Sequence, residues 1–298
     1  MSLRSKNVLG INITVNKKTE ILEEIGKYFE KVKSQKSKVK RKEIKPVAIF
    51  TPNPEIVNFA RKNISFRKIV NSAQINIPDG WGIVWALKKL FHYSIHKISG
   101  ADFMLDLVGL AAKKGLRIGL IGGRDGVAVK ALECLKKKHA NLLGWAMDVP
   151  EIELVGNVSS IKYQVSGIKN EKKIPNTKYL ILNTDCKQSI ATDQYFFCLT
   201  EEIIKRKIDI LFVALGFPKQ EYFINRIMNQ EARIKDTRPL LLMAVGGTFD
   251  YLSGKIPRAP KWLTDRGLEW LYRLIRQPWR LSRQIKGAEF FWWVLAQS

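Results

Sequence analysis

Short apolar runs alternate with longer amphipathic segments along most of this chain. Apolar runs of this length are typical of strands buried on both faces, whereas the longer segments repeat with the period of a helix. The expected elements are a helix at 19–32, a strand at 47–50, a helix from Pro54, a strand at 75–77, helices from Trp81 and at 101–114, a strand at 117–123, helices from Gly126 and from about Gln194, and strands at 209–215 and 241–247. This order predicts an α/β fold with a parallel sheet.

The alternation does not cover the whole chain. It is strong from residue 46 to residue 254, which we take as one main domain, but it weakens between about 145 and 194, where we expect a looped insertion. Residues 1–45 carry 13 Lys and Arg against 5 Glu and are expected to form a basic N-terminal extension and linker. Residues 255–298 are expected to form a C-terminal appendage of amphipathic helices.

Composition narrows the class of protein and of partner. With 46% hydrophobic residues, the 298 residues can bury one large core, and the net charge of +24 indicates an anionic partner: nucleic acid, an acidic membrane face or a phosphorylated substrate. The three cysteines have no metal-ligand spacing and are an odd number, which favours a reducing cytosol. No apolar run is long enough to cross a bilayer, and the N-terminus lacks the apolar region of a signal peptide, so we expect a cytoplasmic protein.

Polar residues gather where the predicted strands end, which is where ligands bind in parallel α/β sheets. The turn TPNPE carries Thr51 and Asn53, and its prolines keep this turn extended at the strand tip. Asn53 also stands where it can cap the helix that begins at Pro54, and the sequence leaves both roles open.

The next turn presents a carboxylate. Asp79 lies between Pro78 and Gly80 at the start of a helix, where it can accept a proton from a sugar hydroxyl. A helix cap is the alternative role for Asp79.

Two further turns carry glycines and an amide. Gly122 and Gly123 let backbone amides approach a ligand closely, but their spacing is not that of a dinucleotide fingerprint, and a plain turn remains the alternative. Lys219 and Gln220 open the helix that follows the strand at 209–215, where an amide can hold a sugar hydroxyl or simply face solvent.

The C-terminal segment is both basic and aromatic. Arginines recur at helical spacing among Trp, Phe and Leu residues, at positions 273, 276, 280 and 283. Such a segment suits the headgroup layer of an anionic membrane, and Pro278 is expected to divide it into two helices. The alternative is a terminal helix that packs on the body with solvated arginines. An exposed apolar tail also favours a homo-oligomer when lipid is absent.

Seven sequence blocks, in order, resemble those of the WecG/TagA/CpsF glycosyltransferases. They are TPNPEIV, IPDGWG, SGAD, IGGRDGVA, LFVALGFPKQE, AVGGTFD and RAPKWL with GLEWLYRLIRQPWR, and they run from about Val47 to Arg283 apart from a gap between about 145 and 194. The resemblance implies a Rossmann-like enzyme that transfers an N-acetylmannosamine-type sugar from a UDP-sugar donor to polyprenyl-diphosphate-linked N-acetylglucosamine. It further implies inversion at the anomeric carbon, no metal or other cofactor, and a peripheral position on the inner face of the cell membrane.

The same resemblance assigns roles to residues. Asp79 matches the proposed general base, Thr51 and Asn53 the residues beside it, and Gln220 the glutamine near the donor sugar. Three arginines of the appendage match those thought to fold over the site and hold the diphosphate: Arg273, Arg280 and Arg283. The other residues expected to bind substrate are Lys97, Asp102, Gly122, Gly123, Lys219, Gly246, Gly247 and Asp250.

The chain departs from the family pattern in two places. Lys97 stands where the family usually has an arginine. The lysine ammonium is a point charge, whereas the arginine guanidinium is a planar fork, so the change bears on donor affinity or specificity. The glycine- and aromatic-rich segment after the third strand is replaced by the insertion, which either joins the donor pocket or bulges outward. The basic N-terminal segment also has two possible roles: it either aids attraction to the membrane or serves as a solvated linker.

Two other functional classes compete with the transferase. A basic α/β protein that binds nucleic acid or modifies RNA would also explain the charge. However, the aromatic residues gather in the C-terminal segment and no nucleic-acid-binding motif is present, so no nucleic-acid partner is expected. A catalytically silent scaffold is disfavoured because Thr51, Asp79 and Gln220 are all retained.

Overall fold

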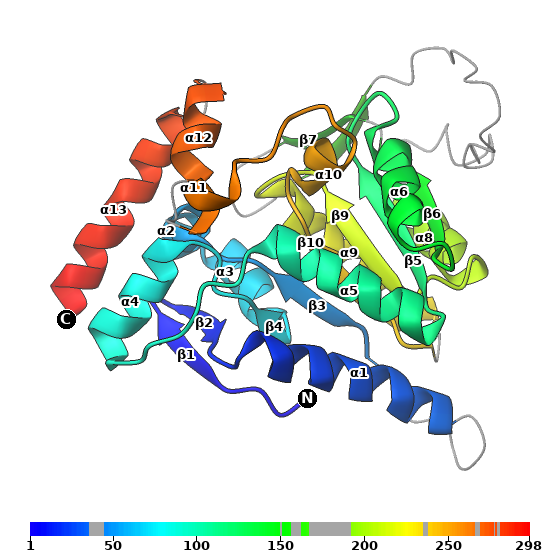
Figure 1. Ribbon diagram of the computed structural model, residues 1–298, viewed down its shortest axis with the longest axis horizontal. Helices are drawn as coiled ribbons and strands as arrows, with labels where there is room; N and C mark the ends of the chain where they lie inside the picture. Colours follow the sequence, from blue (N-terminus) through cyan, green and yellow to red (C-terminus); the bar gives the residue numbers. More distant parts are fainter. Residues whose placement is uncertain are drawn as a thin grey trace.

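The central feature of the computed structural model is a six-stranded sheet whose neighbouring strands are all parallel (Figure 1). The structure describes residues 1–35, 45–149, 151–155, 162–166, 192–234, 238–265, 269–276, 278 and 281–298. In spatial order the strands are β4 (Ile75–Asn76), β3 (Val47–Phe50), β10 (Leu241–Ala244), β9 (Ile210–Ala214), β5 (Arg117–Gly122) and β6 (Leu143–Met147). The predicted α/β fold with a parallel sheet is confirmed.

Helices cover both faces of the sheet, because successive residues of a buried strand point to opposite sides. Ala48 and Phe50 belong to one apolar layer, and Val47 and Ile49 to the other. The first layer is closed by α2 (Pro54–Lys62), α3 (Ile64–Ser72), α4 (Trp81–Phe91), α8 (Thr192–Lys205) and α9 (Lys219–Ile234). The second layer is closed by α1 (Lys18–Gln35), α5 (Gly100–Lys114), α6 (Val127–Lys138) and α10 (Thr248–Leu252).

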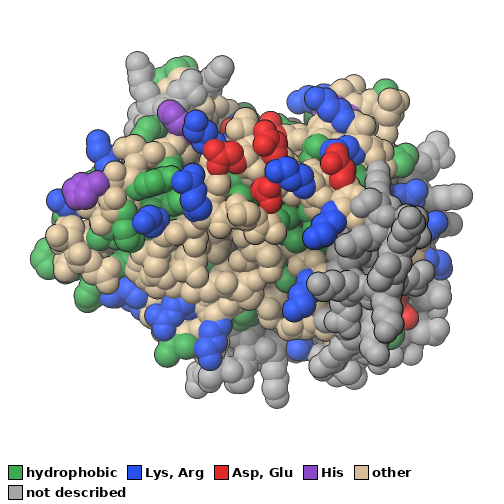
Figure 2. All heavy atoms as spheres, turned by 90° about the horizontal axis from the view of Figure 1, so that it is seen from below, with side chains coloured by type: hydrophobic (Ala, Val, Ile, Leu, Met, Phe, Trp, Pro, Cys, Tyr) green, Lys and Arg blue, Asp and Glu red, His purple; other side chains and the backbone are tan. Residues whose placement is uncertain are grey.

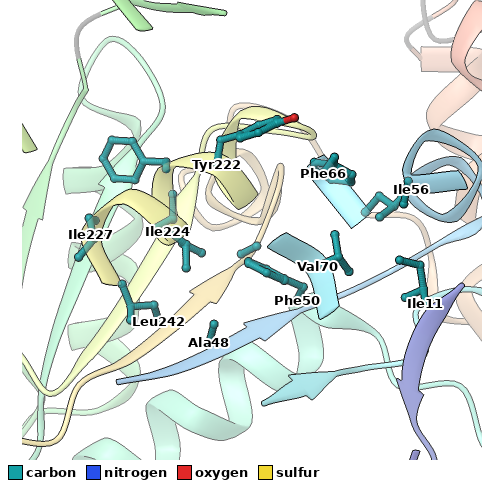
Figure 3. Packing of buried hydrophobic residues seen from close by; sticks show 14 of the residues in the cluster. Ile11, Ala48, Phe50, Ile56, Phe66, Val70, Tyr222, Ile224, Ile227 and Leu242 are labelled. Carbon is teal, nitrogen blue, oxygen red and sulfur yellow. The ribbon is translucent and has the colours of Figure 1, made fainter. Parts of the chain in front are cut away.

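An aromatic cluster in the first layer fixes the turn between β9 and α9. The rings of Phe59, Phe66, Phe217 and Tyr222 lie edge-on or tilted, with centroids 5.0 to 5.5 Å apart. Figure 3 shows Phe66 and Tyr222 beside Phe50 of β3. Edge-to-face packing of this kind stabilises by about 1 kcal/mol per pair, so Phe217 holds its turn firmly against α2 and α3.

The N-terminal residues contribute to both layers. A hairpin, β1 (Ser5–Val8) and β2 (Ile11–Thr14), buries Val8, Ile11 and Ile13 in the first layer, and Figure 3 shows Ile11 near Val70 of α3. Helix α1 buries Ile21 in the second layer. The hairpin was not predicted, and α1 extends three residues beyond the predicted end at 32. Residues 36–44 of the expected linker lie outside the described residues.

The face formed by α1 mixes charges of both signs. Seen from below, it shows acidic side chains directly beside lysines (Figure 2). The ion pairs here include Lys18 with Asp106 at 2.9 Å and Lys27 with Glu24 at 2.9 Å. Exposed pairs of this kind stabilise by less than about 1 kcal/mol. The acidic side chains gather in one part of this face, and basic side chains are spread over the rest of it (Figure 2).

Part of the expected insertion is regular. Strand β6 ends at Met147, so the sheet extends into the region that was predicted to be looped. Two further strands, β7 (Glu151–Val155) and β8 (Lys162–Ser166), form a separate antiparallel pair. The rest of the predicted insertion, at 156–161 and 167–191, lies outside the described residues.

The described C-terminal residues include α11 (Lys261–Asp265), α12 (Glu269–Arg276) and α13 (Leu281–Gln297). Helix α12 ends before Pro278 and α13 begins after it, as predicted. Helix α13 packs on α2 and α4, and its Phe290 and Val294 are completely buried. The packed-helix alternative therefore describes α13, although other apolar side chains of this helix face outward. No helix in the described part of the chain has both the length and the hydropathy to cross a bilayer.

Candidate active site

The predicted site residues follow five neighbouring strands at one edge of the sheet. Because all six strands are parallel, their carboxyl ends share this edge, and the turns after β4, β3, β10, β9 and β5 form a continuous row. Neighbouring strands are about 4.8 Å apart, so the row from β4 to β9 spans about 14 Å. The structure thus brings Asp79, Thr51, Gln220 and the glycine turns to a single edge.

Asp79 is held beside the turn that carries Thr51. Its backbone N–H donates to the carbonyl of Pro52 at 3.2 Å, and Asp79 itself is half-buried. The residue in the cap position of α4 is Gly80, which has φ 87° and no side chain. The turn therefore presents the Asp79 carboxylate one residue ahead of the helix cap position.

Thr51 and Asn53 differ in what their side chains do. Oδ1 of Asn53 accepts a hydrogen bond from the N–H of Ile56 at 2.9 Å, so the capping role left open by the sequence is the observed one. The half-buried Thr51 lies against Gly100, where an added Cβ would be 3.0 Å from Cγ2 of Thr51. Within the described residues the Thr51 hydroxyl makes no hydrogen bond, which leaves it for a ligand.

Two residues expected to bind substrate also contact the base of the C-terminal helices. Oδ1 of Asp102 pairs with Nη1 of Arg258 at 2.7 Å, and Nζ of Lys97 donates to the carbonyl of Thr264 at 3.3 Å. Burial raises the pKa of the Asp102 carboxyl, but the hydrogen bond and charge of Arg258 outweigh burial and hold that pKa below its usual value. Arg258 was not among the predicted site residues, although it belongs to the RAP block.

Gln220 joins two of the turns. Only 3% of Gln220 is exposed; its Oε1 accepts from the N–H of Gly246 at 2.9 Å, and its Nε2 donates to Oε1 of Glu221 at 3.0 Å. Lys219, the first residue of α9, is half-buried beside it. The Gln220 amide is thus engaged on both sides by the protein, and it fixes the β9 turn to the β10 turn.

The turn after β10 leads directly into α10. Gly246 has φ 54°, in the left-handed region that glycine favours, and Gly247 precedes the helix. Asp250 lies in the first turn of α10, with Oδ2 3.4 Å from where a Cβ on Gly247 would be. Helix α10 packs on α6, so this turn is also tied to the β5 side of the site.

The glycine turn after β5 is shaped by the neighbouring strand. At Gly122, where φ is 123°, an added Cβ would be 2.4 Å from the carbonyl oxygen of Ala214. The N–H of Gly123 donates to that same oxygen at 3.3 Å, and the N–H of Gly126 donates to Oδ2 of Asp148 at 2.6 Å. The N–H groups of Gly123 and Gly126 are therefore both bonded within the protein. Asp148 was missed, although an acidic residue just after the next strand was a signal.

Some of the predicted residues are not described. The side chains of Arg273 and Arg283 and the whole of Arg280 lie outside the described residues. Among the residues that the structure does describe, no group of three or more His, Cys, Asp or Glu side chains is arranged to hold a metal ion.

The model of the Glycosyl transferase WecG/TagA/CpsF family matches residues 6–155 and 172–298. This chain belongs to that family. It is accordingly a glycosyltransferase, and the match begins at residue 6 rather than near Val47, so the hairpin and α1 are included.

A named relative is similar over most of its length. It is the N-acetylglucosaminyldiphosphoundecaprenol N-acetyl-beta-D-mannosaminyltransferase of Bacillus subtilis (strain 168), 29% identical over 249 residues, which cover 84% of this chain and 79% of the relative.

Proposed function

We propose that this glycosyltransferase moves an N-acetylmannosamine-type sugar from a UDP-sugar to polyprenyl-diphosphate-linked N-acetylglucosamine, with inversion and without a metal ion. The name of the Bacillus subtilis relative supports both the sugar and the acceptor. The observation that carries the proposal is the joining of the Asp79 turn to the Thr51 turn through the hydrogen bond from Asp79 N–H to the Pro52 carbonyl.

In the proposed reaction, Asp79 is the general base. Its carboxylate takes the proton from the acceptor hydroxyl while the oxygen forms a bond to the anomeric carbon of the donor. The bond from that carbon to the diphosphate breaks on the opposite face, and UDP leaves with the negative charge. A β-linked product made from an α-linked donor requires this single inverting displacement.

The donor is proposed to lie along the row of turns. The connection after β9 runs toward β10 and the connection after β5 runs toward β6, so the chain diverges between these two neighbouring strands. Ligands of parallel sheets bind at such a divergence. UDP therefore lies over the β5 and β9 turns, near Lys219 and the N-terminus of α9, and the sugar points toward Thr51 and Asp79. Gln220 sets the spacing of the β9 and β10 turns beneath the donor. The middle of the donor is lined by Gly246, Gly247 and Asp250.

The diphosphate needs positive charge as UDP departs. By family resemblance, Arg273, Arg280 and Arg283 supply it from the C-terminal helices, which Lys97 and Asp102 hold in place through Thr264 and Arg258. The same helices attach the enzyme to the inner face of the membrane, since the acceptor is lipid-linked and the chain carries a net charge of +24.

The test is a screen of UDP-sugars with a short-chain polyprenyl-diphosphate N-acetylglucosamine, which measures UDP release and product. We expect transfer from an N-acetylmannosamine-type donor, an unchanged rate in EDTA, and a fall in kcat of about 10²- to 10⁴-fold in Asp79→Asn. The matched control is Asp106→Asn on α5, whose carboxylate pairs with Lys18 at 2.9 Å. Equal rates for wild type and Asp79→Asn would remove the base, and no transfer from any UDP-sugar would contradict the function.

A further inference from the structure

Helix α13 meets both turns of the proposed active site at a single glycine. A Cβ added to Gly82 would be 2.4 Å from Cγ of Pro54 and 3.2 Å from Cζ of Phe291. Pro54 directly follows Asn53, and Gly82 is three residues beyond Asp79. The C-terminal helix is therefore in contact with the part of the sheet edge where the acceptor hydroxyl must be deprotonated.

Aromatic side chains are exposed on both sides of this contact. Trp81, at the first position of α4, is 50% exposed, and Phe291 is 41% exposed. Trp85 lies one helical turn after Trp81 on the same face of α4, and its ring centroid is 5.2 Å from that of Phe291. Trp81 and Trp85 thus share one face of α4, with Phe291 packed against Trp85, and this aromatic group begins two residues from Asp79.

The position of α13 is well defined by its contacts with α2. Arg61 stacks on the ring of Trp293 at 3.6 Å from its centroid, and Nζ of Lys62 pairs with Glu289 at 2.5 Å. These contacts and the buried Phe290 set the register of α13. Phe291 is thereby held against Gly82 before any ligand arrives, which reduces the entropy lost on binding an apolar chain.

The C-terminal helices carry further exposed apolar side chains. They are Leu271, Ile275, Leu281, Trp292 and Leu295. An aromatic group that lies beside a carboxylate, next to helices with exposed apolar side chains, fits a ligand that is a long hydrocarbon at one end and a sugar at the other.

We propose that Trp81 and Phe291 form a subsite for the first isoprenoid units of the lipid-linked acceptor, next to its diphosphate. The inference rests on the proposed function and adds to it the residues that bind the lipid. Two residues of chain span at most about 7 Å, so a lipid held at Trp81 keeps the sugar that it carries close to Asp79. Branched isoprene units pack well against flat aromatic faces, which explains why two large apolar side chains are left exposed here.

The experiment uses the full-length enzyme and a series of N-acetylglucosamine diphosphates, all below their micelle concentration and without vesicles. The shortest carries a methyl group in place of the lipid, and the others carry increasing numbers of isoprene units. For wild type we expect kcat/KM to rise with the number of units. In Trp81→Ala we expect about a tenfold lower kcat/KM for the longer acceptors, mainly through KM, and an unchanged value for the shortest. Trp81→Phe is expected to recover most of the loss.

The control is Trp292→Ala, an outward residue of α13 that is 70% exposed. It is expected to keep the wild-type dependence on chain length in solution and to weaken binding to vesicles of anionic phospholipid. Three results would overturn the subsite: no chain-length dependence in wild type, an equal loss for all acceptors in Trp81→Ala, or the same loss in Trp292→Ala. Failure of wild type to use any of these acceptors would instead overturn the proposed function, and the subsite with it.

Discussion

The two ends of the sheet edge differ in what they leave for a ligand. At the β3 and β4 end, the Thr51 hydroxyl makes no hydrogen bond within the described residues, and Asp79 stands ahead of its helix on a turn held by backbone bonds. At the β5 and β9 end, the N–H groups of Gly123 and Gly126 and the Gln220 amide are bonded to the protein itself. One end therefore presents the side chains that we propose to react, and the other presents a fixed shape.

Neighbouring turns of one sheet edge can thus have different roles in a site, one holding its geometry and the other carrying its chemistry. A turn whose polar groups are satisfied internally keeps its geometry when the ligand leaves, because its groups do not seek other partners. A turn that carries the chemistry must keep its groups available. Substitutions at the first kind should therefore change stability, and substitutions at the second kind should change turnover.

The largest effect on stability is expected at the fixed end. In Gly122→Ala the new methyl would meet the Ala214 carbonyl oxygen at 2.4 Å, at a φ that other residues rarely adopt. We expect the free energy of unfolding to fall by about 3 kcal/mol, measured by urea denaturation. The matched control is Gly109→Ala within α5, where nothing lies within 4 Å and the change should be neutral or stabilising by up to about 1 kcal/mol. Similar losses in both variants would contradict the assigned shape.

A smaller effect, on turnover rather than stability, is expected at the reactive end. Thr51→Val keeps the shape of the side chain against Gly100 but removes the hydroxyl, so we expect kcat to fall about tenfold, since a donor to the reacting groups is lost. Thr51→Ser should retain most of the activity. If Thr51→Val lowered the unfolding free energy by more than about 0.5 kcal/mol with unchanged kcat, the division between the two ends would be wrong.

The smallest effect is expected where the sheet edge meets the C-terminal helices. The pKa of Asp102 is lowered in the folded protein, so its pair with Arg258 contributes stability above the unfolded pKa of about 3.9 and loses it as pH falls through the lowered value. The side chains are 50% and 32% exposed, so the contribution should be below about 1 kcal/mol.

Unfolding of wild type and Asp102→Asn should therefore differ by a constant small amount between pH 5 and pH 8 and converge at lower pH. The double variant with Arg258→Gln measures the coupling in the same experiment. A difference that grew as the solution became more acidic would contradict the assigned sign.

The sheet was predictable because its strands are apolar on both faces, a pattern that depends on local sequence alone. The hairpin β1–β2 was not, because its exposed Lys6 and Asn12 break the apolar run, and its turn depends on Leu9 and Gly10 at positive φ. The candidate residues at the strand ends were predictable for the same reason as the strands.

The contacts of those residues were not predictable. The pair between Asp102 and Arg258 joins positions far apart in the chain, and the carboxylate of Asp148 reaches Gly126 only once β6 is placed beside β5. The aromatic stripe of α13 was ambiguous for a physical reason, because the same side chains suit a lipid surface and a protein surface. Phe290 and Val294 are buried against the protein surface.

The burial of Phe290 and Val294 has a practical consequence for truncated enzymes. A chain shortened before Leu281 would leave the surface of α2 and α4 bare in water, and such a protein would aggregate or gather detergent before its rate could be compared with that of the intact chain. Outward point changes such as Trp292→Ala remove exposed apolar area from α13 without exposing the residues that it covers. They therefore test the proposed membrane contact separately from folding, which a deletion cannot do.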